Sequence, residues 1–518
     1  MKRNLALILA LLMLSSSAVA CSNNGGNSDE TKGGTAETTG GATAESTEES
    51  EDPNARLDSG LDKADFDGYT FHIFVHDQVT NDFEAEDITG EPINDAMYQR
   101  TTTVQDNANV TIEPVIVAAD MRGGQKPLGN SVTAGTNDYD LVCMSAYSSC
   151  NALISGYFQN LNAIQNLDLS KPWWDQYSVD EFSFKDAVFQ VTGDISIGDN
   201  NQTFCVYFNK TLANNYQLDN MYEMVDKGTW TIDNFRTLAE KIDGNLDYDN
   251  DGNHVNDPDD LYGIYIWDDI MMGIVNAAGI RCCTIGDDGN LALTLNSERF
   301  VDAFNKFSAY AYDKDLTCEY QRNGYDQDYG QIAFREGRAL FFMHNLGAAV
   351  NFREMEDDFG ILPLPKFDES QERYYNSAAS WGLPLYSVPK SSFSAEEFAR
   401  TGYITQALAY ESLYTLTPAY YEQTLQNKVS RDVESSRMLD LLFATRCYDF
   451  GWYFEIGTYN EAIMNLLRSY STDVSSMYKK FEKVADKTLK KYNEKIQEQI
   501  DLARSEERRV GKECRSRW

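Results

Sequence analysis

The most regular spacing of chemically active side chains is an acidic loop in the middle of the chain. Asp247, Asp249 and Asp251 occupy alternate positions, and Gly252 follows directly. Calcium takes about six to eight oxygen ligands, and this alternation directs successive carboxylates toward one centre while the glycine allows a sharp turn. An EF-hand would have an acidic residue where this chain has Pro258. The spacing therefore predicts either a structural Ca²⁺ site outside the EF-hand pattern or a solvated acidic turn. The predicted ligands are Asp247, Asp249, Asp251, Asn253, Asp257 and Asp260.

The sequence holds no pattern of a known catalytic centre. Neither an HExxH nor a GxSxG motif nor a phosphate-binding glycine-rich loop occurs. The 81 Asp and Glu residues leave a pair of glycosidase carboxylates formally possible, but an acidic surface accounts for them without catalysis. The sequence therefore favours binding over catalysis. The four histidines also lack the spacing of a metal site: His72, His76, His254 and His344.

The N-terminus has the pattern of an exported protein. Two basic residues precede an uncharged apolar run at 5–14, which is too short to span a bilayer of about 30 Å. Small residues then lead to Cys21, so we expect residues 1–20 to be a signal peptide. The residues before Cys21 resemble a bacterial lipobox, with Ala18 in place of the usual leucine. This resemblance implies a lipid on Cys21, and an ordinary signal peptide with an incidental cysteine is the alternative.

Composition limits the classes of partner. Residues 21–64 are mainly small and polar, which predicts a disordered lipid-tether linker. No later segment has 18 uncharged apolar residues, so the remainder is expected to be water-soluble. The net charge of −37 argues against nucleic acid and against an electrostatic contact with anionic lipid. Residues 505–518 turn abruptly basic without a helical stripe and resemble a read-through tail, so we expect them to lie outside the fold.

The nine cysteines show no regular spacing. Cys282 and Cys283 are adjacent and no CxxC pair occurs, which argues against a zinc site. Buried free thiols are expected, and a Cys143–Cys150 disulfide is the alternative.

Strand and helix patterns alternate along the first part of the chain. A helical stripe lies among three β-rich runs, in the order 69–76, 93–107, 110–117 and 139–144. This order is typical of a parallel α/β sheet. Ligands of such sheets bind beyond the carboxyl ends of the strands. Asp77, after the first strand, and Tyr147, in a small-residue loop at 145–149, are therefore candidate binding residues.

The same alternation continues toward the C-terminus. Residues 202–208 predict a strand, and Thr231 is expected to cap a helix over 232–242. Prolines bar the extended segment 360–365 from a central strand position. From Val474, a narrow apolar stripe in a Lys- and Glu-rich sequence predicts a long amphipathic helix that packs on the protein.

Short motifs occur in the order found in one protein family. They are the segment 89–100, Tyr-Phe-Asn-Lys at 207–210, a Trp-Thr-x-Asp-x-Phe helix opening within 228–235, and the segments 334–339 and 359–366. Together they resemble the extracellular solute-binding proteins of ATP-driven (ABC) importers, the carbohydrate-type group that includes maltose-binding protein. The resemblance implies an α/β, type II periplasmic-binding-protein-like fold with two discontinuous lobes and a hinge. The expected bounds are 65–196 and 368–430 for lobe 1, 197–367 and 431–470 for lobe 2, and 471–504 for the C-terminal helix.

The resemblance also points to binding residues. Trp452 matches an aromatic platform of the maltose-binding relatives, and Trp267, followed by Asp268, falls where the family has an aromatic residue in the cleft. Trp381 falls near the hinge, and His344 with Asn345 falls where relatives contact ligand. Core packing is the alternative for the tryptophans and for His344. Of the other tryptophans, Trp230 is expected to be structural, and Trp173-Trp174 could either line the cleft or pack in the core.

Aromatic rings suit ligands with flat CH faces, such as sugars. A ring buries on the order of 150–250 Å², and apolar burial is worth roughly 25 cal/mol per Å². After ordering costs, two such rings fit micromolar affinity, or about −8 kcal/mol. We therefore expect a non-enzymatic, monomeric capture protein, lipid-anchored at the outer face of the bacterial membrane, that delivers a sugar or oligosaccharide to ABC permease subunits. Peptides and polyamines are alternative solutes, and a surface-anchored carbohydrate-active enzyme or a glycan-holding adhesin is the alternative function.

Overall fold

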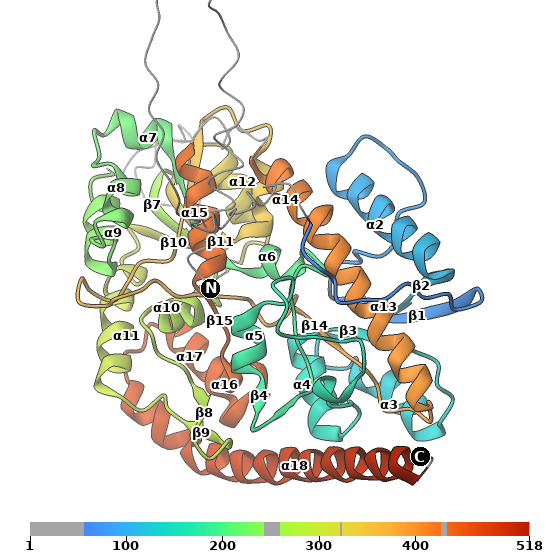
Figure 1. The fold of residues 1–518 in the computed structure, drawn as a ribbon. Coiled ribbons are helices and arrows are strands. Elements are labelled where there is room, and N and C mark those ends of the chain that lie inside the picture. The colour runs from blue at the N-terminus through green and yellow to red at the C-terminus, as the bar shows by residue number, and fades with distance from the viewer. Residues whose placement is uncertain (1–55, 243–258, 322–323, 426–432, 517–518) are drawn as a thin grey trace, which may run out of the picture. The chain divides into compact units, whose positions relative to one another are not determined.

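The computed structural model describes residues 56–242, 259–321, 324–425 and 433–516 (Figure 1). From Leu61 onward the chain forms one compact unit, and residues 56–60 belong to a separate N-terminal unit. Cys21, the predicted signal peptide and most of the predicted tether lie outside the described residues. No described helix combines the length and the apolar character needed to cross a membrane.

A four-stranded sheet forms the centre of what we call lobe 1. Its order is β14-β3-β1-β2, with β1 at Tyr69–His76, β2 at Val110–Val117, β3 at Leu141–Ser145 and β14 at Pro384–Ser387. β1 pairs in parallel with β2 and β3, and β14 is antiparallel to β3. The strands predicted at 69–76 and 110–117 are confirmed, and the one at 139–144 is β3. The predicted loop at 145–149 is wrong, because a helix, α4 (Ala146–Ser155), follows β3 directly.

Helices cover both faces of this sheet. Alternate β1 residues point to opposite sides, as the two-residue period of a strand requires. Phe71 and Ile73 pack in one apolar cluster with α2 (Pro92–Ala108) and α13 (Ala395–Tyr414), whereas Phe74 packs in another with α3 (Gln125–Ala134) and α4. The helix predicted at 93–107 is thereby confirmed as α2.

A five-stranded sheet forms the centre of lobe 2. Its order is β10-β7-β11-β6-β12, with β6 at Phe204–Asn209, β7 at Tyr262–Ile266, β10 at Thr317–Glu319, β11 at Ala339–Asn345 and β12 at Phe359–Leu362. β12 is an edge strand, as its flanking prolines predicted. The strand predicted from Gln202 begins at Phe204, because Gln202 ends the short helix α6 (Gly198–Gln202).

Lobe 2 is also a three-layer structure. Phe204 and Val206 face one apolar cluster, and Cys205 and Tyr207 face the other. The helices packed on the first face are α8 (Met221–Asp226), α9 (Ile232–Ala239), α10 (Ile270–Ala277) and α11 (Glu298–Ala311). Those on the second face are α12 (Tyr329–Arg335), α14 (Leu416–Leu425), α15 (Val433–Ala444) and the 3-10 segment η2 (Leu346–Phe352).

Two sequence predictions at the start of α9 are confirmed. The Thr231 hydroxyl accepts a hydrogen bond from the Asn234 amide (3.3 Å), so Thr231 caps the helix. Trp230 is fully buried and its indole N–H donates to the Pro363 carbonyl (2.8 Å), which makes it a structural residue.

Three segments of the described chain connect the two sheets. The first runs from β5 (Ala187–Val188) through α6 to β6, and the second runs from β12 through β13 (Asn376–Ser377) to β14. The third leaves α13 and passes through α14 and α15 to β15 (Arg446–Cys447). β15 pairs in parallel with β13, and Ala378 forms a bridge with Thr203. The three segments therefore lie side by side. The remaining elements of the first part of the chain are η1 (Leu161–Ala163), α5 (Gln176–Glu181), β4 (Ser183–Phe184) and α7 (Lys210–Asn215).

The C-terminal part begins with three short helical elements, α16 (Phe450–Tyr453), η4 (Ile456–Thr458) and α17 (Tyr459–Arg468). α16 contacts the hairpin strand β8 (Cys283–Ile285), and α17 contacts α10, so both lie on lobe 2. The predicted amphipathic helix is confirmed as α18 (Val474–Ser516), drawn in red in Figure 1. Asn493 of α18 exchanges two hydrogen bonds with Leu291 of β9 (Leu291–Leu293), at 2.8 and 2.9 Å. The helix continues without a break past residue 505.

The cysteines whose side chains the structure describes are all free thiols. Seven are buried, including Cys143 and Cys150, so the expected free thiols are confirmed and a disulfide between these two residues is absent from the described structure.

Candidate functional site

The carboxyl ends of the lobe 1 strands place Asp77 and Tyr147 on neighbouring segments. Asp77 follows β1, and its carboxylate accepts a hydrogen bond from the Ala119 amide in the loop after β2 (3.2 Å). The same loop is tied to the start of α4, because the Ser148 hydroxyl donates to the Met121 carbonyl (2.9 Å). His76 is fully buried between them, and burial lowers its pKa, which keeps the imidazole neutral near pH 7.

Tyr147 and Trp452, predicted independently, are in direct contact across the two lobes. The indole N–H of Trp452 donates to the Tyr147 hydroxyl oxygen (2.9 Å), and the Asn460 side-chain amide donates to the same oxygen (3.3 Å). The Trp452 ring stacks on Phe204, with the ring planes 5° apart. Trp452 is only 1% exposed, so in this structure its ring belongs to a contact between lobes.

An ion pair lies beside this contact. The Arg122 guanidinium packs over the Tyr147 ring (4.5 Å to the centroid) and binds the Glu455 carboxylate at 2.9 Å. Glu455 and Thr458 adopt left-handed backbone conformations, with φ of 49° and 57°. Left-handed non-glycine residues are strained and collect at binding and switch sites. The turn between α16 and α17 is therefore held in place by its contacts with lobe 1.

A second group of predicted residues follows β7. Trp267 is half-buried against the ring of Tyr320, with ring centroids 5.1 Å apart. Asp268 is buried and forms an ion pair with Arg468, the last residue of α17. The Gln321 amide, oriented to satisfy its partners, donates to both Asp268 oxygens at 3.1 and 2.8 Å.

Trp381 lies beside this group and is 39% exposed, a high value for an indole ring. It lies against Asp269, whose pKa burial raises to about 7, and the Trp381 contact opposes part of this rise. Burial also raises the pKa of Asp268, although Arg468 partly compensates. An exposed aromatic ring is thus combined with two closely spaced carboxyl groups.

His344 and Asn345 end β11, whose Met343 pairs with Ile266 at the end of β7. The His344 ring stacks on Phe342, and burial lowers its pKa. The buried Asn345 amide donates to the Gln202 side chain (3.2 Å). Gln202 in turn packs against Gly382, where a Cβ atom would come within 2.5 Å of it. Asn345 therefore reaches the segment that carries Trp381.

Helix α17 joins the two groups of predicted residues. Asn460 in its first turn contacts Tyr147, and Arg468 at its end pairs with Asp268. Ser380, the residue before Trp381, also lies close enough to the Tyr147 hydroxyl to influence its pKa. Tyr147, Trp452, Trp267, Asp268, Asn345 and Trp381 are therefore linked through α17 and residues 380–382. Asp77 instead contacts the loop after β2, and His344 packs on Phe342 within β11.

Several residues of this region were not predicted. Arg122 follows β2, so the strand-end rule that found Asp77 also applies to it. Glu455, Asn460 and Arg468 carry no such signal, because their partners lie hundreds of residues away in the chain.

The predicted metal ligands are largely outside the described structure. Asp247, Asp249, Asp251, Asn253 and Asp257 lie in the gap 243–258, and Asp260 is buried. Among the residues that the structure describes, no three His, Cys, Asp or Glu side chains are grouped to hold a metal ion. The calcium site stays a prediction.

A surface hollow of about 480 Å³ lies elsewhere, on lobe 1. Its lining contains one aromatic ring, one charged group and no predicted binding residue: Lys126, Gly129, Asn130, Thr133, Ala134 and Tyr157. The candidate site lies instead at the strand ends, because indole rings, carboxylates and amides come together there.

Comparison with known proteins adds to this geometry. The family model of the bacterial extracellular solute-binding proteins matches residues 109–400, more than half of the chain. No curated protein matches the sequence. Many solved structures share the fold, and three illustrate the likeness. A cyclic α-maltosyl-1,6-maltose binding protein from Arthrobacter globiformis aligns with TM-score 0.54 and 12% identity, over 82% of this chain and 99% of its own.

The other two structures align comparably. A cyclo/maltodextrin-binding protein complexed with maltotetraose gives TM-score 0.51 and 15% identity, over 83% of this chain and 97% of its own. UgpB from Mycobacterium tuberculosis in complex with glycerophosphocholine gives TM-score 0.50 and 15% identity, over 84% and 98%. These likenesses establish the two-lobed type II architecture that the family resemblance implied.

Proposed function

Because the chain belongs to the bacterial extracellular solute-binding proteins, we propose that it captures a sugar or oligosaccharide between its lobes and passes it unaltered to an ABC permease. The single observation that carries the sugar assignment is the exposed indole of Trp381 against the carboxyl group of Asp269. A sugar offers a flat CH face to such a ring and hydroxyl groups to carboxylates and amides nearby. One of the structurally similar proteins is described as complexed with maltotetraose and another as a cyclic α-maltosyl-1,6-maltose binding protein, which agrees with this choice of solute.

A thermal-shift screen of the purified chain against sugars, peptides and polyamines tests the solute class. Calorimetry on the best ligand should then give a dissociation constant near micromolar. Trp381→Ala should weaken binding at least about tenfold, whereas Trp381→Phe should retain part of the affinity because a ring remains. Tyr470→Ala is a matched control, since Tyr470 is 40% exposed and lies against Tyr312. Stabilisation by peptides or polyamines and by no sugar would overturn the sugar assignment.

The enzyme alternative is tested on the same material. The paired carboxyls Asp268 and Asp269 are the groups in this region that a glycosidase would need. Capture requires that an oligosaccharide be recovered intact after prolonged incubation. Release of reducing ends with turnover, abolished by Asp269→Asn, would instead identify an enzyme.

We also propose that Cys21 carries the lipid that holds the protein at the outer face of the membrane. The lipobox-like sequence before Cys21 supports this proposal. Mass spectrometry of the mature N-terminus should find a diacylglyceryl group on Cys21, and Cys21→Ser should release the protein from the membrane fraction. An unmodified N-terminus at another residue would contradict it.

A further inference from the structure

The three segments that connect the lobes meet around one buried arginine. Arg446 lies in β15, which pairs with β13 of the second segment. Ala378, next to β13, forms a bridge with Thr203 of the first segment. A change of a few backbone angles in such segments rotates whole lobes, because hinge motion concentrates in a few residues.

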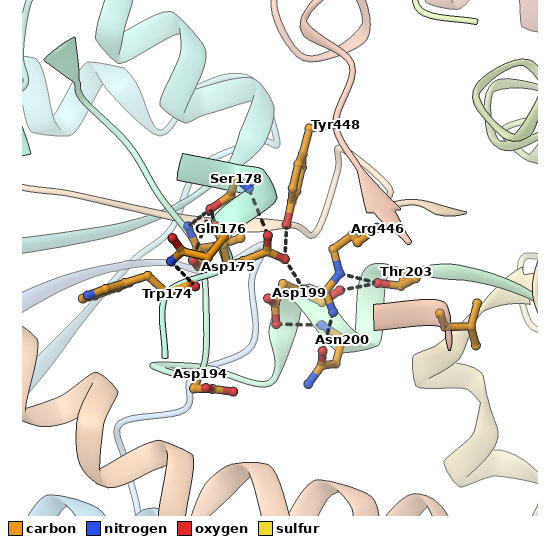
Figure 2. A network of polar contacts seen from close by, with 12 residues as sticks. Trp174, Asp175, Gln176, Ser178, Asp194, Asp199, Asn200, Thr203, Arg446 and Tyr448 are labelled. Atoms are coloured by element: carbon orange, nitrogen blue, oxygen red, sulfur yellow. Dashed lines mark hydrogen bonds and ion pairs between the residues drawn. The ribbon is translucent and has the colours of Figure 1, made fainter. Parts of the chain in front are cut away.

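The Arg446 side chain binds the first segment at three residues. Its Nε donates to the Thr203 hydroxyl (3.0 Å), one Nη donates to Asp199 (2.6 Å), and the other donates to the Asn200 side-chain oxygen. Figure 2 shows the guanidinium group directed at these partners. The side chain is 4% exposed, so water competes little for these bonds.

The same guanidinium group also reaches lobe 1. It donates to the Asp175 carboxylate at 2.9 Å, and the Tyr448 hydroxyl donates to the same oxygen at 3.0 Å. The other Asp175 oxygen caps α5 by accepting from the Ser178 amide (2.9 Å). Because the adjacent Trp174 is buried in the lobe 1 core, Asp175 is a fixed point of that lobe. Arg446 therefore joins lobe 1 to two of the connecting segments and is itself part of the third.

This arrangement is poorly suited to stability alone. One guanidinium faces two carboxylates, and burying such a group costs desolvation energy that apolar residues of the same volume would avoid. Burial raises the pKa of Asp199 to about 6 despite Arg446. The network instead fixes the relative positions of its partners. A guanidinium group holds its acceptors in a planar fork that a lysine ammonium group cannot reproduce.

We propose that Arg446 is a positioning residue that sets the angle between the lobes by clamping the three connecting segments to Asp175. The inference deepens the proposed function, because the lobe angle decides how often the binding-competent arrangement is populated. The apparent dissociation constant equals the intrinsic one divided by that population.

The test compares Arg446→Lys with Arg338→Lys in the full chain without ligand. Arg338 is a matched control, since its side chain is 8% exposed and binds two carboxylates, Asp259 (3.1 Å) and Glu336 (2.8 Å), which lie within lobe 2. Small-angle X-ray scattering reports the lobe angle, and hydrogen exchange reports opening of the connecting segments. Arg446→Lys should change the scattering curve and speed exchange around Thr203 and Asn376 about tenfold or more. Arg338→Lys should change neither, even if it lowers the melting temperature.

A second variant covers the case in which Arg446→Lys does not fold. Thr203→Val keeps the shape of the side chain but removes the hydroxyl that accepts from Arg446. Thr203→Val should change the scattering curve and the hydrogen-exchange rates in the same direction as Arg446→Lys, but by a smaller amount. Curves that superimpose on the wild type for every folded variant of this network would overturn the proposal.

Neither readout uses a sugar, so the two proposals can fail separately. If the wild-type chain binds no sugar but Arg446→Lys still changes the scattering curve, the sugar assignment is refuted and the proposed role of Arg446 in setting the lobe angle stands. If a sugar does bind, Arg446→Lys should raise its dissociation constant at least about threefold, a change that the Arg338→Lys control should not show.

Discussion

Replacing Tyr147 by phenylalanine removes one oxygen atom from the contact between the lobes. That oxygen accepts from Trp452 Nε1 at 2.9 Å and from Asn460 Nδ2 at 3.3 Å. Both donors belong to buried residues, so the lost acceptor cannot readily be replaced by water. The ring remains and can still pack beneath Arg122.

The magnitude follows from the burial of the two donors. Leaving one buried donor unsatisfied costs about 1–3 kcal/mol. The Trp452 bond is short and should contribute most of the loss, while the Asn460 bond is longer and contributes less. We expect the free energy of unfolding to fall by about 2–3 kcal/mol. Combined with Trp452→Phe in a double-mutant cycle, the coupling energy should be about 1–2 kcal/mol.

Urea unfolding of the four proteins in the cycle measures this coupling. Tyr310→Phe is the matched control, because the Tyr310 hydroxyl is buried and has no hydrogen-bond partner in the described structure. Its removal should leave stability unchanged or slightly increased. A coupling energy below about 0.3 kcal/mol, or equal losses for Tyr147→Phe and Tyr310→Phe, would refute the reasoning that Tyr147 joins the lobes.

Three further predictions concern the pH dependence, one close-packed glycine and the calcium loop. Burial raises the pKa of Asp194 to about 7 and that of Asp199 to about 6, so the folded protein retains protons that the unfolded chain releases near pH 4. The stability that these groups contribute is present below about pH 4 and is lost as the pH rises to about 7. Urea unfolding at several pH values should therefore show a free energy of unfolding that falls over this range, and Asp194→Asn should make the fall smaller. A free energy of unfolding that rises over this range would contradict the prediction. Gly451→Ala should destabilise by at least about 2 kcal/mol in the same assay, because its Cβ would lie 2.1 Å from the Cys282 Cβ; an unchanged midpoint would show that α16 can shift. Calcium should raise the melting temperature of the wild type and leave that of Asp249→Asn unchanged. Equal changes in the melting temperatures of the two proteins would refute the predicted calcium site.

The elements of the fold were largely predictable, because their signals are local. The β-rich run of β1 and the prolines beside β12 are each signals of a few neighbouring residues, and both predictions are confirmed. The segment 145–149 was misread because small residues are equally compatible with a loop and with the first turn of α4. The segment is buried against β3 and the loop after β2, and these tertiary contacts favour the helix. A local sequence pattern contains no information about such contacts.

The candidate site was predictable only in part. Tyr147 was found from its place after a strand and Trp452 from family resemblance, but their mutual contact joins residues 305 positions apart. The pair of Arg122 and Glu455 spans 333 positions and depends on how the two lobes meet. Such contacts are set by tertiary structure, and no window of sequence encodes them.

Two of the ionic contacts between distant parts of the chain, Arg122 with Glu455 and Arg446 with Asp175, differ in a way that bears on where the lobes can separate. Arg122 and Glu455 are 44% and 26% exposed, so water can replace their bond and the pair contributes little net stability. Arg446 and Asp175 are 4% and 9% exposed, and breaking their bond would leave buried charges without partners. A rotation that opens the lobes therefore meets less resistance at Arg122 than at Arg446. On this argument we expect Arg446 to stay near the axis of the motion and the lobes to separate first on the side of Arg122 and Glu455.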